Sequence, residues 1–90
     1  MKVLKFGAVW CSGCLVMRPV WQAIEKENSW LKTKYFDYDQ DKKMVDKYNI
    51  QSGRLPAFVF LDKKGQEFLR KTGELGKNEL IKIILENKDR

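Results

Sequence analysis

Residues 2–14 of the chain read KVLKFGAVWCSGC, and this stretch decides the fold. Its first part, Lys2–Ala8, is short and apolar on average, and the Cys/Ser/Gly turn after it favours a buried strand over a helix of two turns. From Ser12 onward, apolar residues recur at helical spacing, which predicts a helix to about Asn28. Both cysteines of the chain therefore lie where a central strand passes into the N-terminus of a helix.

The middle of the chain continues this alternation of strands and helices. Residues 31–39 alternate around aromatic strand formers and predict a second strand, and residues 44–48 carry the apolar spacing of a short amphipathic helix. An irregular loop should follow this helix. The apolar run 57–61, the turn sequence Asp62-Lys63-Lys64-Gly65 and residues 66–72 together predict a β-hairpin.

The end of the chain completes an α/β fold. After Gly76, a final helix is predicted by four apolar residues that form one stripe: Leu80, Ile81, Ile84 and Leu85. The element order is β-α-β-α-β-β-α, which gives a four-stranded mixed sheet flanked by helices. The first βαβ unit must be parallel and right-handed, the hairpin adds an antiparallel pair, and a buried first strand permits the order 2-1-3-4. We expect a single domain over residues 1–90.

The composition limits the classes of partner. In this chain of 90 residues, 43% are apolar and 33% charged, and the net charge of +6 comes from basic residues scattered among twelve acids. Such scattering indicates a solvated surface, and no interleaving of aromatic and basic residues favours nucleic acid. No segment approaches the roughly 20 apolar residues of a membrane span, and no secretory signal is recognisable. We expect a cytoplasmic monomer with no nucleic-acid or membrane partner, although a chain trimmed of a signal peptide would read the same.

The motif Cys11-Ser12-Gly13-Cys14 carries the chemistry. In a βαβ context this spacing is typical of a redox pair, and the partial positive charge of a helix N-terminus lowers a thiol pKa below its free value of about 8.5. Cys11, expected to be exposed at the turn, is therefore the predicted nucleophile. Cys14, one helical turn later, can reach a mixed disulfide at Cys11 and act as the resolving thiol.

A metal or a purely structural role is the alternative to redox chemistry at the cysteine pair. A structural zinc site needs four nitrogen or sulfur ligands, whereas the chain has two cysteines and no histidine, so we expect no metal within one chain. A metal shared between two chains, or an inert buried cysteine pair, would also fit the spacing.

The sequence resembles the thioredoxin family over nearly its whole length. The features that carry the resemblance are Trp10-Cys11-x-x-Cys14, Pro19 inside the first helix, Pro56 at the start of the third strand, and Gly73 after the fourth. The resemblance implies a minimal thioredoxin-like domain, without the family's extra N-terminal strand and helix, that needs no cofactor. A proline inside a helix costs about 3 kcal/mol or more, so a helix that begins at Pro19 is the alternative to the kinked helix of the family.

The resemblance also implies a substrate groove. The proline at the position of Pro56 follows a cis peptide bond in this family and faces the disulfide, and Leu55 would offer its backbone groups to an extended substrate strand. The residues implied around the same groove are Trp10, Ser12, Gly13, Arg54, Leu55, Pro56, Gly73 and Glu74. The implied partners are protein disulfides and, as electron donor, a flavoprotein similar to thioredoxin reductase.

Two departures from the family pattern concern the redox chemistry. Ser12-Gly13 stands where typical thioredoxins have Gly-Pro, which leaves the reduction potential open. Lys5 stands where the family places a buried acid beneath the disulfide. Its ammonium can escape to solvent, pair with Asp37 on the neighbouring strand, or lie near Cys14 and tune that thiol, the last being the interpretation we favour.

Three functions are compatible with these observations. The favoured one is a dithiol enzyme that reduces protein disulfides. A glutaredoxin-like enzyme that uses glutathione is the second, but the sequence lacks Pro-Tyr between the cysteines and Thr-Val before the proline. The third is an interaction module without redox activity, in which the cysteines only staple a loop.

Overall fold

A sheet of four strands forms the centre of the computed structural model, which describes residues 1–90. Its strands stand in the order β2-β1-β3-β4, with β1 parallel to β2 and the other neighbouring pairs antiparallel. The predicted fold class, element order and strand order are thereby confirmed. The strands are β1 (Lys2–Gly7), β2 (Lys32–Asp37), β3 (Ala57–Leu61) and β4 (Glu67–Thr72).

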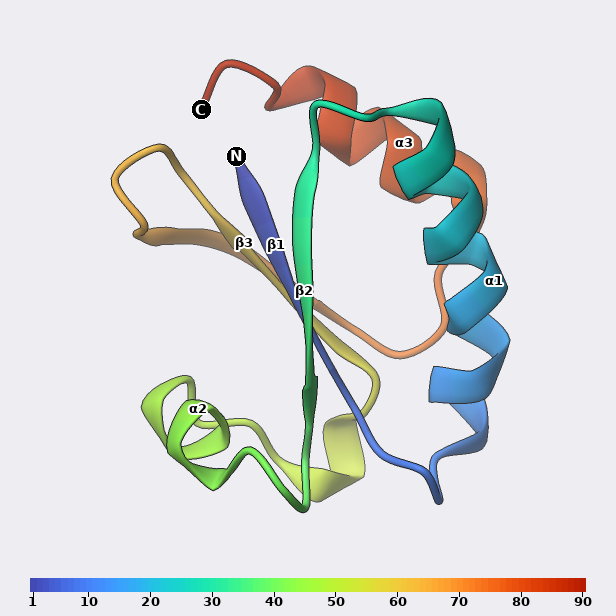
Figure 1. Ribbon diagram of the computed structural model, residues 1–90, viewed down its shortest axis with the longest axis vertical. Helices are drawn as coiled ribbons and strands as arrows, with labels where there is room; N and C mark the ends of the chain where they lie inside the picture. The colour runs from blue at the N-terminus through green and yellow to red at the C-terminus, as the bar shows by residue number, and fades with distance from the viewer.

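Helices cover both faces of the sheet (Figure 1). α1 and α3 lie on one side, and the shorter α2 lies on the other. No helix is long and apolar enough to cross a membrane. A short 3-10 turn, η1, lies within the segment predicted to be irregular. The bounds are α1 (Ser12–Glu27), α2 (Lys42–Lys47), η1 (Ser52–Arg54) and α3 (Lys77–Glu86).

The helix α1 begins beside the first cysteine and continues through Pro19. Cys11 is its N-cap, with extended backbone angles and a Sγ atom that accepts a hydrogen bond from the Cys14 backbone N–H at 3.2 Å. The alternative that the helix begins at Pro19 is therefore wrong. Proline removes the hydrogen bond to the carbonyl of Leu15, and that residue is half exposed, so solvent can satisfy the oxygen.

The strand β2 ends at Asp37, two residues earlier than predicted. The Asp37 carboxylate accepts hydrogen bonds from the backbone N–H groups of Asp39 and Gln40, at 2.9 and 3.0 Å. This bonding of an aspartate to the backbone two residues on makes a turn that competes with the strand ladder. The polar run after Tyr38 therefore turns away from the sheet.

Two hydrophobic clusters, one on each face, hold the sheet between the helices. Along β1, Val3 faces α1 and α3, whereas Leu4 and Phe6 face α2, as the alternation of a strand requires. β3 is buried along its whole length. The cluster against α1 and α3 consists of Val3, Met17, Trp21, Ile24, Leu31, Phe58, Phe60, Leu80 and Ile84. The central strands β1 and β3 are thus packed on both faces, and the C-terminal end of β1 leads into the cysteine pair.

Candidate active site

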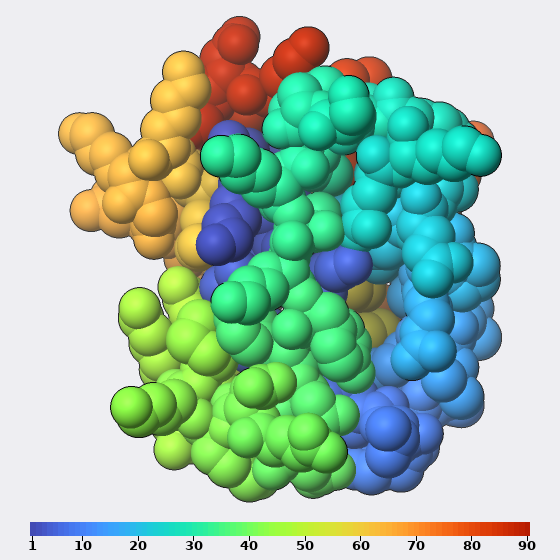
Figure 2. Space-filling view, viewed as in Figure 1, coloured from blue at the N-terminus to red at the C-terminus, as the bar shows by residue number.

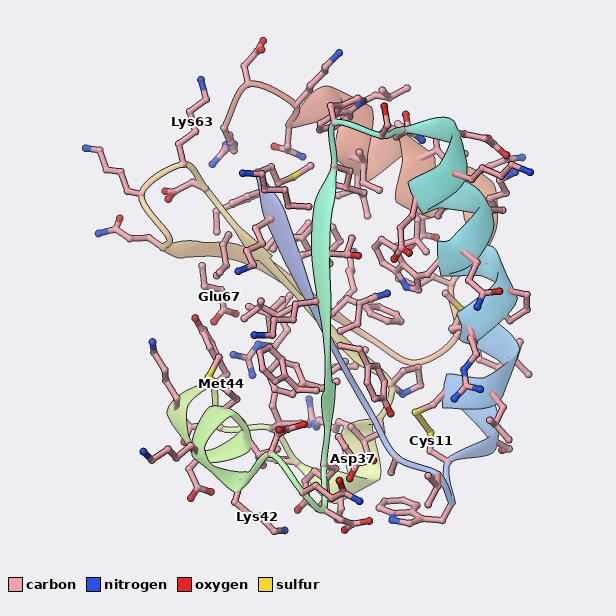
Figure 3. All side chains as sticks on the ribbon, viewed as in Figure 1. Cys11, Asp37, Lys42, Met44, Lys63 and Glu67 are labelled. Atoms are coloured by element: carbon pink, nitrogen blue, oxygen red, sulfur yellow. A yellow bond between two sulfur atoms is a disulfide. The ribbon has the colours of Figure 1, made fainter.

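The two cysteines form a disulfide at the start of α1 (Figure 3), with their Cα atoms 5.3 Å apart. Cys11 is only 8% exposed, so the prediction that it is exposed at the turn is wrong. The segment that carries Pro56 packs closely against the same helix start. A Cβ added to Gly13 would lie 3.2 Å from Pro56 Cδ. Cys14 is partly exposed.

A groove of about 350 Å³ runs past the Cys11 side of the disulfide. It brings together most of the residues that the sequence implied. Its lining consists of Trp10, Cys11, Ser12, Gly13, Ser52, Leu55, Pro56, Gly73 and Glu74.

The residues that line the groove differ from those that the family resemblance implied at two positions of η1. Arg54, implied at the groove, does not line it, and Ser52 lines it without having been predicted. A 3-10 helix has three residues per turn, so Ser52 lies on the same side as Leu55 whereas Arg54 is directed elsewhere. Ser52 could have been found from its i, i+3 relation to Leu55 only if the 3-10 turn itself had been recognised.

The floor of the groove is tied to the end of the hairpin. The Leu55–Pro56 bond is cis, as the resemblance implied. The backbone N–H of Gly73 donates a hydrogen bond of 2.8 Å to the carbonyl of Pro56. Gly73 has a φ of 86°, a conformation that glycine adopts without strain, so a residue without a side chain is favoured at this edge of the groove.

Trp10 is held at the rim of the groove by a residue that the sequence analysis did not single out. Its indole Nε1–H donates a hydrogen bond of 2.7 Å to the Asp39 carboxylate, and its ring meets the ring of Tyr38 edge to face at 6.2 Å. The indole remains 54% exposed, and the preceding Val9 is 79% exposed. An apolar surface therefore borders the disulfide.

Lys5 pairs with a residue that the sequence analysis did not consider. Its Nζ lies 2.6 Å from Glu25 Oε2, which also accepts a hydrogen bond of 2.8 Å from Thr33 Oγ1. The alternative of a pair with Asp37 is wrong because that carboxylate binds backbone N–H groups at the end of β2. In this disulfide form the ammonium points to α1, although Lys5 and Cys14 line the same cavity.

No group of three or more histidine, cysteine, aspartate or glutamate side chains is placed to hold a metal ion.

A family model described as Thioredoxin matches residues 1–78. This chain belongs to the thioredoxin family. A thioredoxin of Rickettsia bellii is 34% identical over 86 residues, which cover 94% of this chain and 79% of that protein. A thioredoxin of Chlamydia trachomatis is 30% identical over 82 residues, which cover 91% of this chain and 78% of the relative.

Solved thioredoxin structures have the same fold. A thioredoxin from Nicotiana alata superimposes with a TM-score of 0.85 at 31% identity, covering 96% of this chain and 71% of the other. A thioredoxin from Fasciola hepatica superimposes with a TM-score of 0.85 at 30% identity, and the match covers 96% of this chain and 79% of the other. With its Cys-x-x-Cys pair at disulfide distance at the start of α1, this thioredoxin family member is a thiol-disulfide oxidoreductase that reduces protein disulfides.

Proposed function

We propose that Cys11 is the nucleophile and Cys14 the resolving thiol in this reduction. The observation that carries the assignment is the capping geometry at the start of α1. Cys11 Sγ already accepts the Cys14 N–H at 3.2 Å, so a thiolate there would gain a charge-assisted hydrogen bond and the field of the helix N-terminus. Cys11 also lines the groove, whereas Cys14 lines a cavity on the other side of the disulfide.

The proposed cycle transfers two electrons to the substrate. The Cys11 thiolate attacks one sulfur of a substrate disulfide, which forms a mixed disulfide and releases the other substrate sulfur as a thiolate. Cys14 then loses its proton and attacks Cys11 Sγ, which breaks the mixed disulfide and releases the second substrate thiolate. The substrate gains two thiols, and this protein ends as the Cys11–Cys14 disulfide.

The groove is the proposed binding site for an extended substrate segment. Its walls come from the helix start, the cis-proline loop and the end of β4, and they contribute Trp10, Ser12, Gly13, Leu55, Pro56, Gly73 and Glu74. Backbone groups of Leu55 are proposed to pair with the substrate main chain, which gives affinity without sequence specificity. Arg54, which is exposed outside the lining, is proposed to contact substrate only beyond the groove.

The proposed redox partner that restores the dithiol is a flavoprotein similar to thioredoxin reductase. Membership of the thioredoxin family supports this partner. The proposal further takes residues 1–90 as one domain that works as a monomer in the cytoplasm, where glutathione and thioredoxin systems keep thiols reduced.

Insulin reduction in the presence of dithiothreitol tests this function. The wild-type protein should accelerate precipitation of the insulin chains, and Cys11→Ser should reduce the rate to that of dithiothreitol alone. Gly53→Ala is the control, because a Cβ at this exposed position meets nothing within 4 Å. Activity that persists in Cys11→Ser would contradict the assigned nucleophile.

Glutathione turnover separates the proposed function from a glutaredoxin-like activity. The proposal predicts that reduced glutathione with its reductase supports no more than a small fraction of the turnover that dithiothreitol supports. Equal turnover with both reductants would favour the glutathione-dependent enzyme. A Cys11–Cys14 disulfide that does not equilibrate with dithiothreitol would instead identify an inert staple.

A further inference from the structure

A cavity of about 240 Å³ lies on the opposite side of the disulfide from the groove, between α1 and the strands β1 and β2. Figure 2 shows it as a hollow between β2 and α1, with atoms of β1 and β3 visible at its base. Cys14 lines it from the beginning of α1, and Glu25 lines it from near the end of the same helix. The side of Cys14 that faces away from substrate therefore has its own surroundings.

Gly7 brings a phenol close to the sulfur of Cys14. A Cβ built on Gly7 would lie 3.1 Å from Cys14 Sγ and 3.1 Å from the hydroxyl oxygen of Tyr35. Cys14 Sγ and the Tyr35 hydroxyl oxygen are therefore at most twice 3.1 Å apart. Because residue 7 is glycine, no side chain from it lies between them. β1 and β2 run in parallel register, which places Tyr35 beside Lys5 and Asp37 beside Gly7.

The cavity is polar enough to hold water. Trp21, which is 2% exposed, lines it, and its indole Nε1–H is buried without a hydrogen-bond partner among the protein groups. That nitrogen has almost no surface that water can reach, so water in the cavity is held by other groups. The Lys5–Glu25 ion pair lines the same space and supplies the polar partners that a water there needs.

The Tyr35 hydroxyl is suited to donate a hydrogen bond. Tyr35 is half exposed; its partial burial raises the pKa of the phenol above its ordinary value, the carboxylates of Asp37 and Asp41 raise it further, and Arg18 acts in the opposite direction. The phenol therefore keeps its proton at neutral pH. The other ionisable groups that line the cavity are Lys5 on β1 and Cys14, Arg18 and Glu25 on α1.

We propose that the Tyr35 hydroxyl donates a hydrogen bond to the Cys14 thiolate in the resolving step, and that water in the cavity accepts the proton that the Cys14 thiol loses. This inference rests on the proposed role of Cys14 as the resolving thiol. When that thiolate attacks Cys11 Sγ, the mixed disulfide breaks, the substrate leaves as a thiolate, and the hydrogen bond from Tyr35 is released. The phenol keeps its own proton throughout.

The test is the titration of both thiols of the reduced protein by NMR, in the wild type and in Tyr35→Phe. Loss of one hydrogen bond to a charged group should raise the Cys14 pKa by about one unit and leave the Cys11 pKa nearly unchanged. The resolving step at neutral pH should slow about threefold to fivefold, because a tenfold loss of thiolate is partly offset by greater nucleophilicity.

Two further variants make the test specific. Gly7→Ala places a methyl group against both Cys14 Sγ and the Tyr35 ring, so it should also raise the Cys14 pKa by separating them. Tyr48→Phe is the matched control, since Tyr48 packs on Phe6 within the cluster on the α2 side of the sheet, and it should leave both thiols unchanged.

The outcome distinguishes this inference from the proposed function. A Cys14 pKa and a resolving rate in Tyr35→Phe equal to those of the wild type would overturn the role of Tyr35, even if Cys14→Ser still accumulates mixed disulfides at Cys11. Failure of Cys14→Ser to accumulate them would instead overturn the proposed role of Cys14.

Discussion

The ion pair between Lys5 and Glu25 should contribute measurably to stability, because it links β1 to the C-terminal part of α1. Only 18% of the Lys5 side chain and 31% of the Glu25 side chain is exposed, and Thr33 holds the same carboxylate oxygen. The perturbation is a double-mutant cycle of Lys5→Met and Glu25→Gln. The Lys5 ammonium also lies 5.8 Å from the centre of the Trp21 ring. Lys5→Met removes this contact both in the wild type and in Glu25→Gln, so the contact cancels from the coupling free energy.

The magnitude follows from the surroundings of the two charges. Unit charges about 4 Å apart attract by about 1 kcal/mol in water and by about 4 kcal/mol at an effective dielectric constant of about 20. Partial exposure places this pair between those limits, and lost side-chain entropy reduces the gain. We expect a coupling free energy of about 1.5 kcal/mol. The pair Lys77–Glu27, exposed by 39% and 53%, provides the matched control, with an expected coupling of about 0.3 kcal/mol.

The assay is urea denaturation of the oxidised protein at low and at moderate salt. The Lys5–Glu25 coupling should persist at about 0.5 M salt, whereas the coupling of the exposed pair should vanish. If the two pairs gave equal coupling energies, the conclusion that partial burial strengthens the Lys5 pair would be refuted.

Two further predictions concern the core and the hairpin. Ile84→Ala should lower the free energy of unfolding by about 2–4 kcal/mol in urea denaturation, because Ile84 is completely buried, whereas Leu85→Ala, at a half-exposed neighbour, should change it by less than about 1 kcal/mol. Hydrogen bonds from the backbone N–H of Gln66, and then of Lys64, lower the pKa of Asp62, so its stabilisation is present above the ordinary aspartate pKa and is lost as the pH falls through the lowered value. An NMR titration of the Asp62 carboxyl should give a midpoint below the ordinary range, and Asp62→Asn should lose stability less steeply in acid; a midpoint in the ordinary range would contradict the hydrogen bonding.

The elements of the fold could be predicted because their signals are local. The signals are a strand followed four residues later by Cys-Ser-Gly-Cys, a helical period after Ser12 and the turn at Gly65, and each occupies a few consecutive residues. Gly65 indeed has a φ of 81°, as the turn requires. The central position of β1 followed from the order of these elements, and the two clusters bury both of its faces.

Most of the site residues that were not predicted are placed there by contacts between segments that lie far apart in the sequence. Glu25 lies twenty residues from Lys5 in sequence, and it became the partner only because α1 crosses the sheet with that face inward. The Tyr35 hydroxyl lies near Cys14 Sγ because Gly7 has no side chain to separate them, and this proximity requires the register that β1 and β2 adopt. Ser52 replaced Arg54 at the groove because the loop winds into a 3-10 turn.

The measurement that tests the assigned chemistry most directly is the trapping of mixed disulfides on the two single-cysteine variants. Cys14→Ser and Cys11→Ser, each reduced and mixed with a disulfide-containing protein such as insulin, are quenched by acid and mapped by mass spectrometry. We predict a lasting adduct at Cys11 in Cys14→Ser, and at most a trace at Cys14 in Cys11→Ser, because only Cys11 combines the helix cap with the groove. An adduct that forms as fast at Cys14 as at Cys11, or at neither, would contradict the account.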